Sequence, residues 1–270
     1  MVFHAVYFSP TGTTKTVVGS FVQTLAASMG TDAPIQTHDF TLPGARKTPP
    51  SFQPGDVVAM GVPVYAGRVP NVLLTYLNGI EGNGARAVAL VLYGNRHFDD
   101  ALLELSDILT ARGFSVVAGG AFIGEHSFST TLAGGRPDRE DMAQVALFGR
   151  EVAAKLSGTE CAGLPPLPGN RPYRPYYVPQ DEGGKSTDIR KVKPKTNDDC
   201  HDCMLCVDLC PMGSISAVDP RVIEGICIKC GACIKGCPSG AKYFDDADYL
   251  RHKRELEIDF AARKEPVRFL

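Results

Sequence analysis

The first 160 residues of this 270-residue sequence contain no cysteine, whereas eight of the nine cysteines lie between Cys200 and Cys237. A chain of this length has room for one or two domains, each with its own apolar core. The abrupt change in cysteine content indicates two domains, with a boundary that precedes Cys200.

The sequence also lacks an excess of charge of one sign, because 28 Lys and Arg stand against 30 Asp and Glu. Nucleic acid and anionic membranes attract a strongly basic surface, so neither is expected as a partner. No segment approaches the ~20 apolar residues of a membrane span, and no basic segment precedes a long apolar run at the start. We therefore expect a cytoplasmic protein, in which a dense cysteine cluster favours metal ligation over disulfides.

Apolar runs alternate with helical patterns through residues 1–157. The runs that predict strands are 2–8, 57–61, 85–92 and 114–123. Helices are expected from about Thr13, from Asp99, and from Pro137 or Asp138 to about Leu156. Such alternation predicts an α/β domain with a doubly wound parallel sheet, and the almost wholly apolar run 85–92 predicts a central strand.

Residues 158–197 are rich in proline, glycine and charge, which predicts a semi-extended linker. The lone Cys161 in this linker is interpreted as an ordinary thiol. A linker of roughly 40 residues reaches across a small domain, so the second domain could dock on its own chain or on a second copy in a homodimer. Residues 198–246 form the cysteine domain, and residues 247–270 form a charged helix or tail.

The pattern C-x2-C-x2-C-x3-C-P occurs twice, 27 residues apart. In this pattern three cysteines hold one [4Fe-4S] cluster and the fourth crosses to the other cluster. One ligand set is Cys200, Cys203, Cys206 and Cys237, and the other is Cys227, Cys230, Cys233 and Cys210. Structural zinc sites are the alternative, although zinc requires neither the third cysteine nor the proline. Residues 200–244 resemble the two-cluster bacterial ferredoxins, which implies a small α+β domain and one-electron transfer.

A hydroxyl-rich loop joins the first strand to the first helix. It contains Ser9, Thr11, Gly12, Thr13 and Thr14. Backbone N–H groups, hydroxyls and the positive end of the helix dipole would bind a phosphate there. Neither the Walker A pattern nor G-x-G-x-x-G is present, and an ordinary helix N-cap is the alternative interpretation.

Two further segments, 61–68 and 93–98, follow the predicted strands 57–61 and 85–92 at the edge where such sheets bind ligands. With the hydroxyl-rich loop they resemble the flavodoxin family over residues 1–157, which implies FMN. The resemblance implies phosphate contacts from the loop and flavin contacts from Pro63, Val64, Tyr65, Ala66, Gly67, Tyr93, Gly94, Asn95, Arg96, His97 and Phe98.

Within this resemblance, Tyr65 matches the inner ring that stacks on the flavin and Phe98 matches the outer ring. The Ala66–Gly67 peptide matches the one that flips to bond the flavin N5. Arg96 and His97 add positive charge that would stabilise reduced flavin, although for His97 a solvated loop position is the alternative. Because the flavin loops are short, we expect the flavin edge to be exposed to a protein partner.

Two functions remain open. The favoured one is an electron carrier that links FMN, two [4Fe-4S] clusters and redox protein partners such as a ferredoxin, a flavodoxin or an oxidoreductase, in anaerobic metabolism. The alternative is an enzyme that reduces a quinone, dioxygen or a disulfide, and a substrate pocket would distinguish it. The segment 124–131 follows the last strand, where an interdomain or partner-facing role is expected.

Overall fold

The computed structural model describes residues 1–31, 33–158, 163–181 and 183–270, so Cys161 lies outside the described residues. The parallel strands of the first half are β1 Phe3–Tyr7, β2 Ile35–Asp39, β3 Val57–Pro63, β4 Arg86–Tyr93 and β5 Ser115–Ile123. Its helices are α1 Thr13–Ser28, α2 Leu74–Leu77, α3 Ala101–Ala111 and α4 Arg139–Ser157, with short 3-10 turns at η1 Pro43–Arg46 and η2 Asn71–Leu73. The predicted alternation is confirmed.

The strands of the first half follow the order β2-β1-β3-β4-β5, which is the flavodoxin-like doubly wound order. Sheets of this kind bind ligands beyond the carboxyl ends of the strands where the order reverses, here between β1 and β3. A further strand, β8 Val267–Phe269, pairs antiparallel with β5. The predicted charged tail therefore ends as an edge strand of the first half.

Both faces of the sheet are covered. Helices α1 and α4 lie on one face, where the Phe21 and Phe148 rings have centroids 5.3 Å apart. On the other face, Leu105 of α3 belongs to the second buried cluster. Adjacent residues of β4, Val88 and Ala89, contribute to opposite clusters, which explains why this strand is apolar at every position from Ala87 to Leu92.

The second half repeats its backbone as well as its sequence. Its short helices are α5 Leu205–Asp208 and α6 Ala232–Lys235, and its antiparallel ribbon is β6 Lys195–Thr196 with β7 Lys242–Tyr243. Positive φ angles recur at matching places in the two repeats, in the pairs Asp202 and Lys229, Met204 and Gly231, and Gly213 and Gly240. Strand β6 lies inside the range 158–197 that the sequence assigned to the linker.

The described part of the linker lies against the first half. The Tyr177 backbone N–H donates to the Ala66 carbonyl at 2.9 Å, and the Tyr176 hydroxyl donates to the Val69 carbonyl at 2.8 Å. The Arg68 guanidinium lies 4.6 Å from the centre of the Tyr173 ring. These contacts fix the linker to its own chain, so it is not a free tether. A 3-10 turn, η3 Ile189–Lys191, follows before β6.

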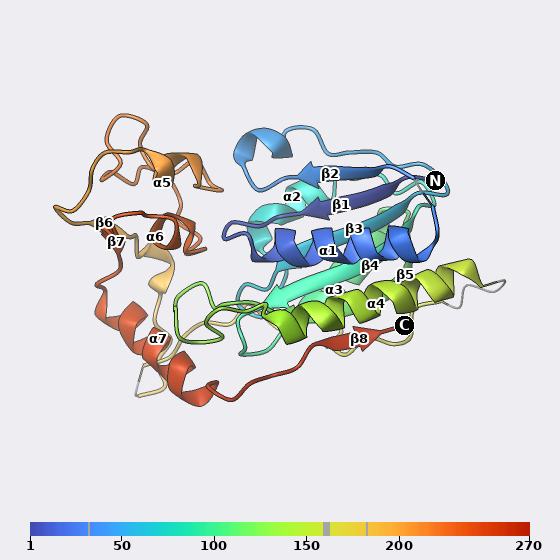
Figure 1. Cartoon of the computed structure of the whole chain (residues 1–270). Helices are drawn as coiled ribbons and strands as arrows, with labels where there is room; N and C mark the ends of the chain where they lie inside the picture. Colours follow the sequence, from blue (N-terminus) through green and yellow to red (C-terminus); the bar gives the residue numbers. More distant parts are fainter. Residues whose placement is uncertain (32, 159–162, 182) are drawn as a thin grey trace.

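Asp246 caps the N-terminus of helix α7, Ala247–Asp259, because its side chain accepts a hydrogen bond from the Tyr249 backbone N–H at 2.9 Å. Figure 1 shows the second half beyond the carboxyl ends of the strands, with α7 and β8 leading back along the first half. A helix both long and apolar enough to cross a membrane is absent from the described residues.

Candidate cofactor sites

The hydroxyl-rich loop forms the start of α1. Gly12 is the N-cap with φ 84°, a left-handed conformation that suits glycine, and the first turn contains no acidic residue. The Ser9 Oγ accepts a hydrogen bond from the Lys15 backbone N–H at 2.9 Å. Within the described residues, the backbone N–H groups of Thr13 and Thr14 have no protein acceptor. A helix start of this kind attracts an anion such as a phosphate.

The side chains of the loop are not equally available. Thr11 is exposed and its Oγ1 lies 3.4 Å from the Thr13 Oγ1. Thr14 is buried, with 2% of its surface exposed, so only its backbone N–H can serve a bound anion. The loop therefore fits a phosphate through N–H groups and two hydroxyls.

The loop after β3 forms a tight turn. Tyr65 and Arg68 exchange backbone hydrogen bonds of 3.0 and 3.1 Å, and Ala66 and Gly67 between them have φ angles of 51° and 80°. Alanine is strained at such an angle, so the surroundings must hold the turn in place. The linker does so at Ala66, whose carbonyl accepts the Tyr177 N–H. Pro63 ends β3, and the Val64 N–H donates to the Leu92 carbonyl at 2.7 Å.

The loop after β4 divides into two groups. Tyr93, Gly94, Arg96 and His97 line a cavity. Asn95 and Phe98 do not. The Asn95 side chain is buried and donates to the carbonyls of Phe260 and Ala262 at 2.6 and 2.9 Å, which holds the segment after α7.

The placement of Phe98 differs from its expected role as the outer flavin ring. Its side chain is 5% exposed and belongs to the core cluster beside Tyr93, with centroids 5.7 Å apart. One face of the ring stacks on His97. Phe98 therefore offers no face to the cavity, because the loop turns its ring toward the apolar interior.

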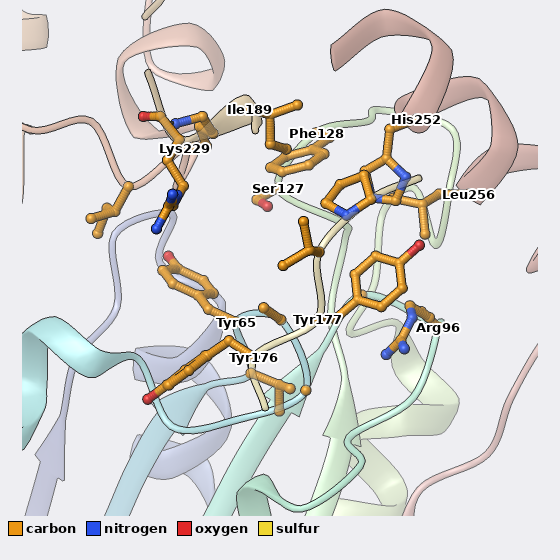
Figure 2. A pocket seen from close by; sticks show the side chains of 18 of the residues that line it. Tyr65, Arg96, Ser127, Phe128, Tyr176, Tyr177, Ile189, Lys229, His252 and Leu256 are labelled. Atoms are coloured by element: carbon orange, nitrogen blue, oxygen red, sulfur yellow. The ribbon is translucent and has the colours of Figure 1, made fainter. Parts of the chain in front are cut away.

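The cavity has a volume of about 660 Å³, which lies in the range of small-molecule and cofactor sites. Four parts of the chain form it. The first part is the set of loops after β3, β4 and β5, and the others are the linker, the cysteine domain and α7. Figure 2 shows Tyr65, Tyr177, Lys229 and His252 around it, one from each of these parts. The linker and the second half line the same cavity as the loops that would hold the flavin and so cover part of these loops, whereas Ala66 and His97 are exposed.

Burial in the cavity shifts the pKa of two polar rings of the first half, His126 and Tyr65. Burial and the nearby Lys235 lower the pKa of His126 to about 4, so this ring is neutral at pH 7. Its Nδ1 lies 3.1 Å from the Phe128 backbone N–H and accepts that hydrogen bond, which leaves the proton on Nε2. Burial, together with the thiols of Cys230 and Cys227, raises the pKa of Tyr65 well above its usual value.

The eight described cysteines form no disulfide. Burial raises the pKa of Cys230 to about 12, and the neighbouring thiols of Cys227 and Cys210 add to the rise. Burial raises the pKa of Cys233 to about 12 as well, and the thiols of Cys230, Cys227 and Cys210 add to the rise. Cys210 therefore lies with the cysteines of the other repeat, as the crossing pattern requires.

The remaining four cysteines form the second group. Burial raises the pKa of Cys206, with contributions from Cys200 and Cys237. Cys203, which lies between Cys200 and Cys206 in the sequence, is exposed. Among the described residues, no three Cys, His, Asp or Glu side chains converge on a site for a single metal ion.

The segment 125–131 contacts the second half, as its interdomain role predicts. The Lys235 Nζ forms an ion pair with the Glu125 carboxylate and donates to the carbonyls of His126 and Ser129 at 2.8 and 2.9 Å. On the opposite side, the Arg46 guanidinium donates to the Pro211 carbonyl. These contacts hold the cysteine domain over the carboxyl edge of the sheet.

Family comparison identifies the second half. Residues 197–213 and 224–242 match the family described as a 4Fe-4S binding domain, and these segments contain all eight clustered cysteines. No curated protein matches the chain. The chain thus joins a flavodoxin-like domain, defined by its strand order, to a 4Fe-4S binding domain.

Several solved structures are similar to the first half. One is a flavodoxin from the domain Archaea, 15% identical over 58% of this chain and 100% of that chain, with a TM-score of 0.40. Flavodoxin 2 from Bacillus cereus is 16% identical over 57% of this chain and 99% of that one, with a TM-score of 0.42. The NADH:FMN oxidoreductase EmoB in its apo form is 16% identical over 59% and 91%, with a TM-score of 0.41.

Sequence reasoning missed the cavity residues of the linker and of α7. These are chiefly Tyr176, Tyr177, His252 and Leu256. The run RPYRPYYVP in the linker was a signal, because three tyrosines are unusual in a solvated tether. No comparable signal marks α7.

Proposed function

We propose that this chain is an electron-transfer protein that holds FMN in its first half and two [4Fe-4S] clusters in its second half. When bound, a flavin exchanges one or two electrons and each cluster exchanges one. The observation that carries the proposal is that Tyr65 and Cys227, from the two expected cofactor sites, line the same cavity. Electron exchange within one chain requires such proximity.

The residues present suit FMN in three ways. The free N–H groups at the start of α1 suit the phosphate, as described above. The cavity has the size of a cofactor site, and its aromatic lining suits a flat ring. The His126 Nε2–H and the Arg96 guanidinium add hydrogen-bond donors for the polar edge of the ring.

The proposed ligand sets are Cys200, Cys203, Cys206 and Cys237 for one cluster, and Cys227, Cys230, Cys233 and Cys210 for the other. Their surroundings differ, because Cys203 is exposed whereas Cys230 is buried. We assign exchange with redox protein partners to the Cys203 side and exchange with the flavin to the Cys227 side. Both halves of a single chain contribute to the cavity, so the proposal requires no homodimer.

A small-molecule reductase is the second candidate, and the cavity favours it. The second half and the linker cover part of the flavin loops, so a protein partner has less access to them than a small molecule has. A quinone, dioxygen or a disulfide remains the proposed substrate class. A cytoplasmic location and a role in anaerobic metabolism belong to the carrier proposal.

Purification without oxygen, followed by cofactor analysis, tests the proposal. We expect one FMN and about eight iron atoms per chain, because each cluster contains four. FAD in place of FMN, or zinc in place of iron, would contradict it. Turnover with ferredoxins and with small oxidants then separates the two candidates, since saturable reduction of a small molecule identifies an enzyme.

A further inference from the structure

The cavity contains a buried ammonium group, on Lys229, that lacks a carboxylate partner. Lys229 is 7% exposed and lines the cavity between the two halves. Its Nζ donates to the carbonyls of Arg190 at 2.9 Å and of Cys227 at 3.1 Å. Within the described part of the chain, no carboxylate lies at salt-bridge distance from it. A buried cation held only by neutral acceptors favours negative charge nearby.

The other cations of the cavity are neutralised. Arg96 forms an ion pair with Asp99, and Arg190 forms one with Asp188 at 2.7 Å. An ammonium group has three N–H donors, and the two carbonyls use two of those on Lys229. Its charge and its third donor therefore remain for whatever occupies the cavity.

The internal repeat provides a comparison for this position. Asp202 occupies the same place in the first repeat, and both residues have a positive φ, 52° for Asp202 and 56° for Lys229. The Asp202 side chain is on the surface, where it pairs with Arg221. The backbone conformation thus accepts either charge. The positively charged residue of this pair, Lys229, belongs to the repeat that lines the cavity, whereas Asp202 belongs to the repeat whose described residues do not.

We propose that Lys229 serves both cofactor sites at once, by stabilising the negative charge that the flavin and the adjacent cluster gain when they are reduced. The inference rests on the proposed function. A cation at low effective dielectric, next to Cys227 and in the wall of the cavity, favours the reduced forms of both groups. Lys229 therefore raises the reduction potentials of both groups.

Anaerobic potentiometric titration of the loaded full-length protein tests this proposal, with the flavin followed by absorbance and the clusters by electron paramagnetic resonance. FMN and iron content are measured first, so absence of the cofactors would defeat the proposed function and not this inference. In Lys229→Gln we expect the equilibrium constant for reduction to fall about tenfold at both sites, or about 59 mV for a one-electron step. Lys229→Arg, which keeps the charge, should restore most of the loss.

Lys242 provides a matched control. It is 3% exposed, donates to the Thr196 Oγ1 at 2.7 Å, and is near enough for its charge to oppose the burial that raises the pKa of Cys206. It is not among the described residues that line the flavin cavity. Lys242→Gln should therefore shift the clusters and leave the flavin potential unchanged. An unchanged flavin potential in Lys229→Gln would overturn the proposal.

A second variant decides the matter if Lys229→Gln does not retain its iron. Asp188 lines the cavity near Lys229, and its exposed side chain contacts only Arg190 among the described residues. Asp188→Asn removes a negative charge that opposes both Arg190 and Lys229 in the cavity wall, so the flavin potential should rise. A flavin potential that falls or does not move would contradict the inference, because charge at this wall would then not reach the flavin.

Discussion

The two halves of the chain are stabilised in different ways. In the first half, buried apolar side chains cover both faces of a parallel sheet. In residues 198–246, the buried apolar side chains other than proline are only Ile215, Cys230, Ala232 and Ala241. Lys229 and Lys242 are buried there as well. A segment with so small a core requires metal ligation or external contacts to fold, whereas the first half has a large apolar core of its own.

Removal of iron should have the largest effect on this contrast. We expect the amides of residues 198–246 to lose most of their protection from hydrogen exchange, because ligation holds the cysteine loops together. The amides of β1, β3 and β4 should keep theirs. Hydrogen exchange of the full chain, before and after removal of iron without oxygen, checks this. Unchanged protection of residues 198–246 would show that the second half folds without clusters.

The opposite perturbation is Phe148→Ala. Phe148 of α4 is fully buried and packs against Phe21 of α1, so its loss should destabilise the first half by about 3–5 kcal/mol. Iron content should not change. Denaturant unfolding followed by circular dichroism measures the loss, with Phe148→Leu as the milder control. A cost below about 1 kcal/mol for Phe148→Ala would contradict the assigned core.

The boundary between the halves should be sensitive to acid. His126 has a pKa of about 4 in the folded chain against 6.5 for an unperturbed ring. Because the unfolded chain binds this proton first, stability is complete above pH 6.5 and is lost as the pH falls toward 4, by up to about 3 kcal/mol. His126→Asn removes the titrating group and keeps an acceptor for the Phe128 N–H. Unfolding at pH 7 and pH 5 should therefore show a smaller loss in the variant, and an equal loss would refute this cause.

Lys235→Met should have the smallest of these effects. It removes the ion pair with Glu125 and two hydrogen bonds to carbonyls across the boundary, which weakens docking by about 1–3 kcal/mol. Proteolysis of the linker should become faster. The control is Lys195→Met, whose pair with Asp245 lies on the surface and should not affect docking. Equal proteolysis rates in both variants would mean that Lys235 does not hold the halves together.

Sequence reasoning succeeded where the determinants are local. The cysteine spacing is such a determinant, because ligands of one loop must reach one cluster. The apolar run of β4 is another, since burial on both faces leaves no polar position. The loop before α1 also follows from a short stretch, whose Gly12 adopts a left-handed conformation.

Where a residue depends on distant partners, the sequence was insufficient. The direction of the Phe98 ring depends on the core beside Tyr93. The attachment of the linker depends on the Ala66 carbonyl, which is more than a hundred residues away in the chain. Strand β8 has only three residues and becomes a strand by pairing with β5. None of these partners can be identified from local periodicity.

The central claim is that the cluster held by Cys227 lies next to the flavin, whereas the cluster that includes Cys203 faces outward. Rapid mixing with a one-electron reductant tests it in two full-length variants whose FMN and iron content has been measured. Cys210→Ser should lose the Cys227 cluster and abolish reduction of the flavin through the clusters. Cys237→Ser should lose the other cluster and keep exchange between the remaining cluster and the flavin, at a rate independent of protein concentration. The reverse pattern, with flavin exchange lost in Cys237→Ser and retained in Cys210→Ser, would contradict the account.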